Sequence, residues 1–531
     1  MTASTVSAAN LVQSVDWLAI APPTIAALAG LVVLVADLFL PERNKPLLGW
    51  ISVGSLVLAG LALLPLLDGD RRTFCLTTSG DGDVCSYVAD EFTLAIQLLV
   101  LGGALLTALL SINPVADQKL PAGEFWFLLL SAVAGAALLP ASRDLATLVV
   151  ALEVASLPAF ALVGMRRGDR LSSEAALKFF LSSVTATAVT LLGVSFVYAA
   201  TGSMHLTEVA DGLTHVDPRL ETLAQTGVAL TLVGFAFKTA AVPFHFWVPD
   251  TYVGAPLPVA AYLSVIGKAV GFTGIILVTV IAFPAYDDVW GPAVAVLAAL
   301  TMTAGNVAAL RQRPERAHSA VRLLAWSSVG QAGYLLVPVA AAGYADSSGE
   351  ATHAIGSTVA YALMYAAVNL GAFAVAALVA RTSAANRISD YRGLYATRPL
   401  AALALGFFLL CLAGLPPGII GLFAKVTVFS VAVDAGLGWL AVVMAVNVVI
   451  ALYYYLQWTA VLFRGSEATE ATEAAAGTGA PAAETGAPAQ VAVRPGIPAP
   501  LTSAIGLAAV VGVVLSGAPQ LVLRFASGTL L

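Results

Sequence analysis

The sequence carries little charge. Asp, Glu, Lys and Arg make up 11% of the 531 residues, whereas a soluble chain has about 25%. Hydrophobic residues make up 59%. Apolar runs of about 20 residues, the length that crosses the bilayer core, recur from residue 18 to residue 524. These features exclude an ordinary soluble protein and predict an all-α polytopic membrane protein without a soluble domain of appreciable size.

The sequence also lacks the motifs of redox and nucleotide chemistry. It has three cysteines and five histidines, too few and too scattered for an iron–sulfur centre or a haem. No Gly-x-Gly-x-x-Gly opens a helix after a strand, and no Walker A lysine is present. We therefore expect no cofactor and no metal on this chain, and no binding of nucleic acid. If the protein moves ions uphill, a partner or another gradient must supply the energy.

The apolar runs predict fourteen membrane spans. Each is long enough to cross the hydrocarbon core as a helix. The predicted spans are 18–40, 47–67, 92–112, 124–141, 144–165, 174–200, 222–249, 256–282, 289–310, 322–342, 351–380, 399–432, 438–462 and 501–526.

The loops predict an orientation. If the N-terminus lies outside, sixteen Lys and Arg residues fall on the inside and five on the outside. Positive residues prefer the inner side of a membrane, so this orientation is the favoured one. An even number of spans then places both termini outside.

The cysteines agree with this orientation. Cys75 and Cys85 lie ten residues apart in the first outside loop, where an oxidising environment favours a disulfide. Two free thiols remain the alternative. Cys411 lies within a span and reads as a small buried hydrophobic residue. Residues 465–500 are rich in Ala, Gly, Thr, Pro and Glu and predict a flexible inside linker with no function assigned.

Four of the six lysines fall inside predicted spans: Lys178, Lys238, Lys268 and Lys425. A lysine at the bilayer centre costs at least roughly 2.5–3.5 kcal/mol, so residues of this kind are usually functional. Burial disfavours the charged form of a lysine and a nearby carboxylate restores it, so small movements can switch its protonation. The lysines therefore indicate a protein that moves protons.

Two of these lysines lie beside prolines that interrupt a span. Lys238 is five residues before Pro243, and Lys425 is eight residues after Pro417. Proline breaks the hydrogen bonding of a helix, and irregular backbone survives in a membrane only where protein or a hydrated cavity surrounds it. A structural kink explains either break alone. Because both breaks have a lysine close by, we interpret them as parts of an ion path.

Two further charged residues lie deep in their spans. Lys268 is midway along span 256–282, too far from either surface to reach it easily. Glu153 is the carboxylate near the centre of span 144–165, and Lys238 is its natural partner. A structural salt bridge is the alternative for Lys268.

Other polar residues give weaker signals. Lys178 follows Glu174 by four residues near the inside end of its span, so an interfacial ion pair explains it as well as proton transfer does. Asp37 is expected to reach the headgroup region. His245 either caps the broken helix or relays protons, and capping is the simpler reading. One face of span 351–380 carries Tyr361, Tyr365 and Asn369, which either line a wet path from Lys268 to Lys425 or hydrogen-bond neighbouring helices.

Three sequence blocks carry a resemblance to a known family. They are residues 237–256 (FKTAAVPFHFWVPDTYVGAP), 322–334 (RLLAWSSVGQAGY) and 414–425 (GLPPGIIGLFAK). Together they resemble the antiporter-like membrane subunits of bacterial respiratory NADH–quinone oxidoreductase, or complex I. Within that family the segment 250–256, Lys425 and the number of spans resemble subunit N. The loop from Arg311 to Arg322 and the linker 465–500 depart from the usual pattern.

The resemblance implies a fold and a division of the chain. It implies two inverted five-helix repeats, each with one proline-broken helix. The implied parts are an N-terminal group of three helices with an outside loop at 68–91 (1–123), a first repeat (124–282), a second repeat (289–462), the inside linker (463–500) and a C-terminal helix (501–531).

The resemblance also implies a function. Protons would pass from the cytoplasm along Glu153, Lys238, Lys268 and Lys425 to the outside, with Lys178 a weaker candidate. The chain would then be a subunit of an H⁺-translocating enzyme in the bacterial inner membrane. NADH, FMN, iron–sulfur clusters and quinone are expected in partner subunits, and other membrane subunits would flank the chain.

Two alternatives stay open. A subunit of a multi-protein sodium–proton antiporter would use similar residues without redox coupling. A structural membrane subunit would keep its lysines as relics, and their removal would affect only assembly.

Overall fold

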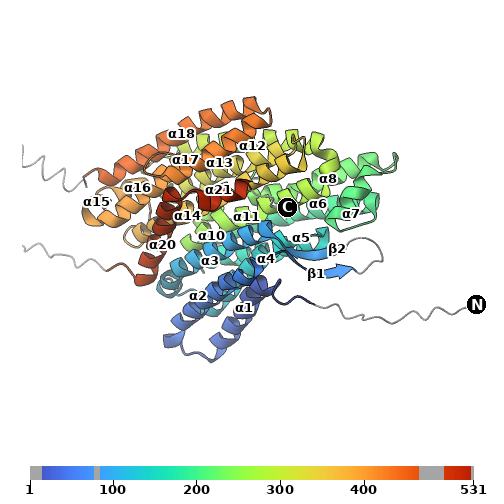
Figure 1. Cartoon of the computed structure of the whole chain (residues 1–531). Helices are drawn as coiled ribbons and strands as arrows, with labels where there is room; N and C mark the ends of the chain where they lie inside the picture. Colours follow the sequence, from blue (N-terminus) through green and yellow to red (C-terminus); the bar gives the residue numbers. More distant parts are fainter. Residues whose placement is uncertain (1–14, 77–83, 466–495, 528–531) are drawn as a thin grey trace, which may run out of the picture.

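The computed structural model describes residues 15–76, 84–465 and 496–527, and these are almost entirely helical. The long helices lie side by side with their axes roughly aligned (Figure 1). Twelve of them are long and apolar enough to cross a membrane. These twelve correspond to twelve of the predicted spans, and the other two are the spans that proline interrupts. The polytopic helical fold is confirmed, whereas the total of fourteen and the inverted repeats stay predictions.

The first half of the chain runs from α1 at the lower edge of the bundle to α10 and α11 in its middle (Figure 1). The N-terminal elements are α1 (Ala21–Phe39), α2 (Pro46–Leu61), β1 (Arg71–Leu76), β2 (Val84–Ala89) and α3 (Glu91–Asp117). The next are α4 (Ala122–Leu138), α5 (Leu145–Val163), α6 (Arg170–Thr201), α7 (Leu206–Thr214), α8 (Glu221–Thr239), α9 (Val248–Gly254), α10 (Leu257–Tyr262) and α11 (Lys268–Ile276).

Two π-helical segments flank α11, so that α10 to residue 282 forms one long helix. They are η4 (Leu263–Gly267) and η5 (Leu277–Ala282). Short 3₁₀ turns elsewhere are η1 (Glu42–Asn44), η2 (Leu64–Leu66), η3 (Leu139–Ala141), η6 (Pro284–Tyr286) and η7 (Ile388–Tyr391).

The second half of the chain contains the most buried helices. Its elements are α12 (Asp287–Leu310), α13 (Ser319–Ala342), α14 (Ser348–Ala380), α15 (Leu394–Thr397), α16 (Pro399–Ala413), α17 (Ile419–Asp434) and α18 (Gly438–Phe463). Two helices complete the described chain, α20 (Ala499–Gly517) and α21 (Gln520–Ser527). Residues of α13 and α14 are buried along nearly the whole helix, whereas α1, α2 and α20 expose many of their apolar residues. Lipid or partner helices would cover such apolar faces.

The last predicted span, 501–526, is wrong at its end. Helix α20 stops at Gly517, and α21 is a separate helix. Pro519 explains the break, because a residue before proline disfavours the helical conformation, and Ala518 has φ −134° and ψ 64°.

The two proline-interrupted spans are broken as predicted. Helix α8 ends at Thr239 and α9 begins only at Val248, and α16 ends at Ala413 while α17 begins at Ile419. A residue in the left-handed region ends each first half: Ala240 with φ 66° and Gly414 with φ 85°. The breaks at Val242-Pro243 and Pro416-Pro417 each contain a cis peptide bond.

The β1–β2 hairpin marks one end of the helix bundle, called the hairpin end below. The Cys75–Cys85 disulfide closes the hairpin, so the predicted bridge is present in the structure. Asp16 pairs with Arg71 of β1 at 3.1 Å. Arg524 of α21 lines the same cavity as Asp70 and Glu91, so the described chain starts and finishes at this same end. The opposite end carries the arginine-rich loops and is called the arginine-rich end.

The disulfide can be counted chemically. We expect one thiol, that of Cys411, to react with a maleimide in the denatured, unreduced subunit, because Cys75 and Cys85 are bonded to each other. After reduction three thiols should react, which mass spectrometry of the subunit would count. Three reactive thiols before reduction would contradict the bridge.

Candidate functional site

Three of the four predicted lysines lie deep inside the bundle. The relative exposed area is 5% for Lys238, 1% for Lys268 and 5% for Lys425, whereas 47% of the Lys178 side chain is exposed. Among the described residues no carboxylate lies within 4.0 Å of the three buried ammonium groups. Each buried lysine therefore depends on other groups to replace its lost water.

The ammonium group of Lys425 is hydrogen-bonded at the end of α16, the first half of the broken helix. Its Nζ donates to the carbonyl oxygens of Leu412 at 2.9 Å and Ala413 at 2.7 Å. These are the last two residues of α16, whose final carbonyls have no partner within the helix. The negative end of the helix dipole also favours a cation there. The same break that frees the carbonyls thus holds the ammonium group.

Gly414 makes this contact sterically possible. A Cβ at this position would lie 3.2 Å from Cδ and 3.5 Å from Nζ of Lys425, and the backbone has φ 85°. Only glycine combines this backbone conformation with such a close approach at little cost. The Gly-Leu-Pro-Pro segment therefore interrupts the helix and also leaves room for the Lys425 side chain.

Lys238 is held differently. Its Nζ lies over the rings of Phe160, Phe179 and Phe237, at 5.0, 5.1 and 5.7 Å from their centroids. A cation gains energy from the faces of aromatic rings, more so where water is excluded. The indole of Trp247 donates to the carbonyl of Phe237 at 3.2 Å and so satisfies one of the final carbonyls of α8.

Glu153 and its expected partner Lys238 make no direct ion pair in the structure. The Glu153 carboxylate accepts a hydrogen bond from Thr187 at 2.6 Å instead, and no ion pair with Lys238 forms within 4.0 Å. The aromatic rings that surround Lys238 take the space next to its ammonium group. Glu153 acts on Lys238 at longer range through its charge.

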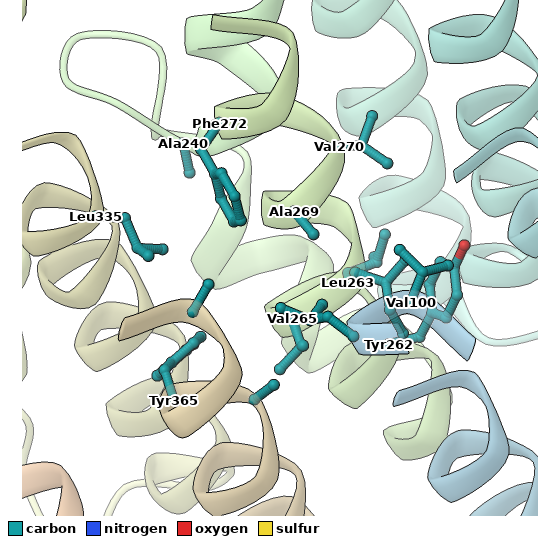
Figure 2. Packing of buried hydrophobic residues seen from close by; sticks show 14 of the residues in the cluster. Val100, Ala240, Tyr262, Leu263, Val265, Ala269, Val270, Phe272, Leu335 and Tyr365 are labelled. Atoms are coloured by element: carbon teal, nitrogen blue, oxygen red, sulfur yellow. The ribbon is translucent and has the colours of Figure 1, made fainter. Parts of the chain in front are cut away.

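Lys268 has no hydrogen-bond partner among the residues that the structure describes. It is the first residue of α11, directly after the π-helical segment η4. Such segments often occur at functional sites. Figure 2 shows the apolar packing around this helix: Val265 and Ala269 lie between Tyr262 on one side and Tyr365 and Leu335 on the other. An unpartnered ammonium group in apolar surroundings requires water or loses its proton.

Polar side chains of α14 extend from the Lys268 helix toward Lys425. Asn369 donates to Ser264 Oγ at 2.7 Å, Tyr365 donates to the Ser264 carbonyl at 3.1 Å, and Tyr361 donates to Gln331. The predicted helix–helix hydrogen bonds are thus present. Tyr361 and Tyr365 also line a cavity of about 20 Å³ beside Lys425, which is large enough for one water.

Sequence reasoning missed Ser264 and Gln331 as members of this row. Ser264 precedes Lys268 by four residues and so shares its helix face, a signal that the sequence contained. Gln331 also donates to Tyr455, which hydrogen-bonds Ser327. That contact joins α13 to α18 across 124 residues of sequence, and no local pattern reveals it.

The weaker candidates lie nearer the surface. Lys178 pairs with Glu174 at 2.7 Å, as predicted, and with Asp250 at 2.9 Å. Asp250 also lies 3.6 Å from Arg322, so this network ties α6, α9 and α13 together at the arginine-rich end. Exposed pairs of this kind contribute little individually.

Two local expectations stay predictions. Asp37 pairs with Lys45 at 3.5 Å, while its position at the headgroup region stays a prediction. No side chain caps the start of α9 at Trp247, and the capping of the broken helix by His245 stays a prediction. The His245 ring lies 5.6 Å from the Trp326 ring. In the described part of the chain no group of three or more His, Cys, Asp or Glu residues is placed to hold a metal.

The comparisons with known proteins match this arrangement. The family model "NADH:quinone oxidoreductase/Mrp antiporter, TM" matches residues 142–451. The NADH-quinone oxidoreductase subunit N 2 of Streptomyces griseus is 73% identical over 98% of this chain and 95% of its own length. The chain belongs to the subunit N family of NADH-quinone oxidoreductases. The matched range contains Glu153 and the three buried lysines.

Solved structures agree with membership of the subunit N family. A chain of respiratory complex I from Thermus thermophilus is 30% identical, with a TM-score of 0.71 over 96% of this chain and 100% of that chain. The Mrp complex from Dietzia sp. DQ12-45-1b gives a TM-score of 0.77 at 23% identity, over 96% of both chains, which shows a shared fold alone.

The substitution Gly414→Ala tests whether the close approach of Lys425 to the helix end is needed for function. The new methyl group would press on Lys425 and strain the left-handed backbone by about 1–2 kcal/mol. We expect a several-fold loss of NADH-driven proton pumping in membrane vesicles, in complexes that assemble normally on a native gel.

Gly406→Ala is the matched control on the same helix. A Cβ at Gly406 meets only side-chain atoms at 3.8 Å, an ordinary contact distance. Equal pumping in the two variants would contradict the role of Gly414.

Proposed function

We propose that this chain translocates protons along a row of buried groups formed by Glu153, Lys238, Lys268 and Lys425. The observation that carries the proposal is the burial of three lysines with no carboxylate of the described residues within 4.0 Å. A permanent charge at such a buried position does not stabilise the fold. An amine there can instead gain and lose a proton, and the groups around it control which form is favoured.

The polar residues between the lysines support the same proposal. Ser264, Asn369 and Tyr365 lie on the Lys268 side, and Tyr361 and Gln331 lie beside the Lys425 cavity. Hydroxyl and amide groups with room for single waters can pass protons by hydrogen-bond exchange. Lys238 has a similar cavity of about 20 Å³ on its side, which Gly267 of the Lys268 helix also lines.

The chain is a subunit of an enzyme complex, and the energy for pumping would come from the partners. NADH, FMN, iron–sulfur clusters and quinone would belong to these partners. Electron transfer from NADH to quinone would supply the energy for proton transfer along the lysines. Other membrane subunits would cover apolar helices at the edges of the bundle.

The proposed direction is from the arginine-rich end to the hairpin end. The arginine-rich end would face the cytoplasm by the distribution of basic residues, and the disulfide would face the outside. The membrane would be the bacterial inner membrane, with both termini outside.

Lys268→Ala tests the proposal. Removing the central amine should lower both NADH-driven quinone reduction and proton translocation about tenfold or more, because proton-transfer groups contribute factors of this size. Both activities would be measured in inverted membrane vesicles, with assembly checked on a native gel.

Lys178→Ala is the matched control. Its ammonium group is half exposed and paired at the surface, so we expect activity close to that of the unchanged complex. Full quinone reduction and pumping in assembled Lys268→Ala would show that the lysine is structural and would overturn the proposal.

A further inference from the structure

A cavity of about 470 Å³ opens beside the loop that joins α12 to α13 at the arginine-rich end. It is called the basic cavity below, because three arginines line it: Arg311, Arg316 and Arg322. The remaining lining residues used here are Gln312 of the loop, Val307 and Ala308 of α12, and Trp326 of α13. The proton path does not use this loop, which departs from the usual pattern of the family.

The arginines of the loop have few carboxylates to pair with. Segment 311–322 contains four arginines and one glutamate. Among the described residues no carboxylate lies within 4.0 Å of Arg311, Arg313 or Arg316. Arg322 lies 3.6 Å from Asp250, but that carboxylate also pairs with Lys178 at 2.9 Å. The basic cavity therefore keeps an excess of positive charge, which attracts an anion.

Gln312 adds an unsatisfied acceptor to the basic cavity. Its Nε2 donates to the carbonyl of Ala308 at 2.8 Å. Its Oε1 is buried and has no hydrogen-bond partner in the part of the chain that the structure describes. A buried acceptor of this kind is stabilised by a donor that a ligand brings. Together with the guanidinium groups, it fits a phosphate ester whose alcohol carries a free hydroxyl group, such as glycerol.

The apolar part of the basic cavity continues along the outer face of α12. Leu300 and Val296 precede Val307 by seven and eleven residues, so the three share one face of the helix. Leu300 is 50% exposed and Val296 is 51% exposed. Over the eleven residues the helix rises about 16 Å, about half the thickness of the hydrocarbon core. This apolar stripe, Val296 to Val307, therefore has the length of an acyl chain in one leaflet.

The arginines lie at the level of the membrane surface. The apolar span that contains α12 ends at Leu310, and Arg311 follows it directly. Trp326, which also lines the cavity, belongs to a residue type that is enriched at the interface between membrane and water. Phospholipid phosphates occupy this same level, next to the hydrocarbon core.

The basic cavity and the apolar stripe together select an amphiphile. A soluble anion would contact the guanidinium groups and leave the stripe uncovered. An acidic protein segment would do the same, because its carboxylates favour water over hydrocarbon. An anionic phospholipid covers both, and basic pockets between membrane helices are known to bind such headgroups.

We propose that the basic cavity binds an anionic phospholipid of the leaflet at the arginine-rich end. The phosphate lies among the guanidinium groups of Arg311, Arg316 and Arg322. A hydroxyl group of the headgroup donates to Gln312, and an acyl chain lies along the apolar stripe. This site goes beyond the proposed function and does not depend on proton translocation by the lysines.

Photo-crosslinking in the assembled complex tests the site. The complex is reconstituted in phosphatidylcholine vesicles that contain a phosphatidylglycerol with a diazirine in its acyl chain, and mass spectrometry locates the adducts after illumination. We expect an adduct between Val296 and Val307, and several-fold less labelling there by a phosphatidylcholine with the same diazirine. No adduct on this segment, or equal labelling by the two lipids, would overturn the proposal.

Arg316→Gln and Arg313→Gln form a matched pair of variants. Both arginines are exposed and belong to the same loop, but only Arg316 lines the basic cavity. Each substitution removes one positive charge, so a general effect of charge on the membrane surface is equal in the two. We expect Arg316→Gln to lower labelling of the stripe by phosphatidylglycerol roughly fivefold, the factor that one basic residue contributes near an anionic lipid.

Arg313→Gln should leave this labelling close to that of the unchanged complex. Assembly of both variants is checked on a native gel. Equal labelling in the two assembled variants would show that the loop attracts lipid only through its overall charge, and would overturn a defined site at the basic cavity.

Discussion

The need to replace the water lost by a buried ammonium group governs much of this structure. At Lys425 the replacement is the end of a helix: the carbonyls of Leu412 and Ala413 accept from Nζ because α16 stops there. The break alone would leave unsatisfied carbonyls, and the lysine alone would be an unsolvated charge. The ammonium group donates to the free carbonyls, and Gly414 leaves the space for this contact.

In the first half of the chain, different groups replace the water lost by the buried ammonium group of Lys238. Aromatic rings surround Lys238, and the indole of Trp247 donates to the carbonyl of Phe237 near the end of α8. The carboxylate of Glu153 stays at a distance, bonded to Thr187. Among the described residues Lys268 has no hydrogen-bond partner. The three lysines therefore differ in the groups that lie next to their ammonium groups.

Much of the fold could be predicted from the sequence because apolar length and proline act locally. Twelve helices, both breaks and the disulfide follow from such signals. Pairings between distant segments could not be predicted in this way. The Glu153–Lys238 pair was expected from charge alone, but the packing of Phe160 and Phe179 decides where the ammonium group lies. The contact of Gln331 with Tyr455 likewise depends on tertiary packing.

The most direct test of the account is the number of protons pumped per NADH by complexes carrying Lys425→Met. Methionine fills a similar space but cannot hold a proton, and the helix break remains. The account predicts that the assembled variant, reconstituted in sealed vesicles, pumps far more slowly and moves fewer protons per NADH. An unchanged rate together with an unchanged proton-to-NADH ratio would contradict the claim that the buried lysines carry the protons.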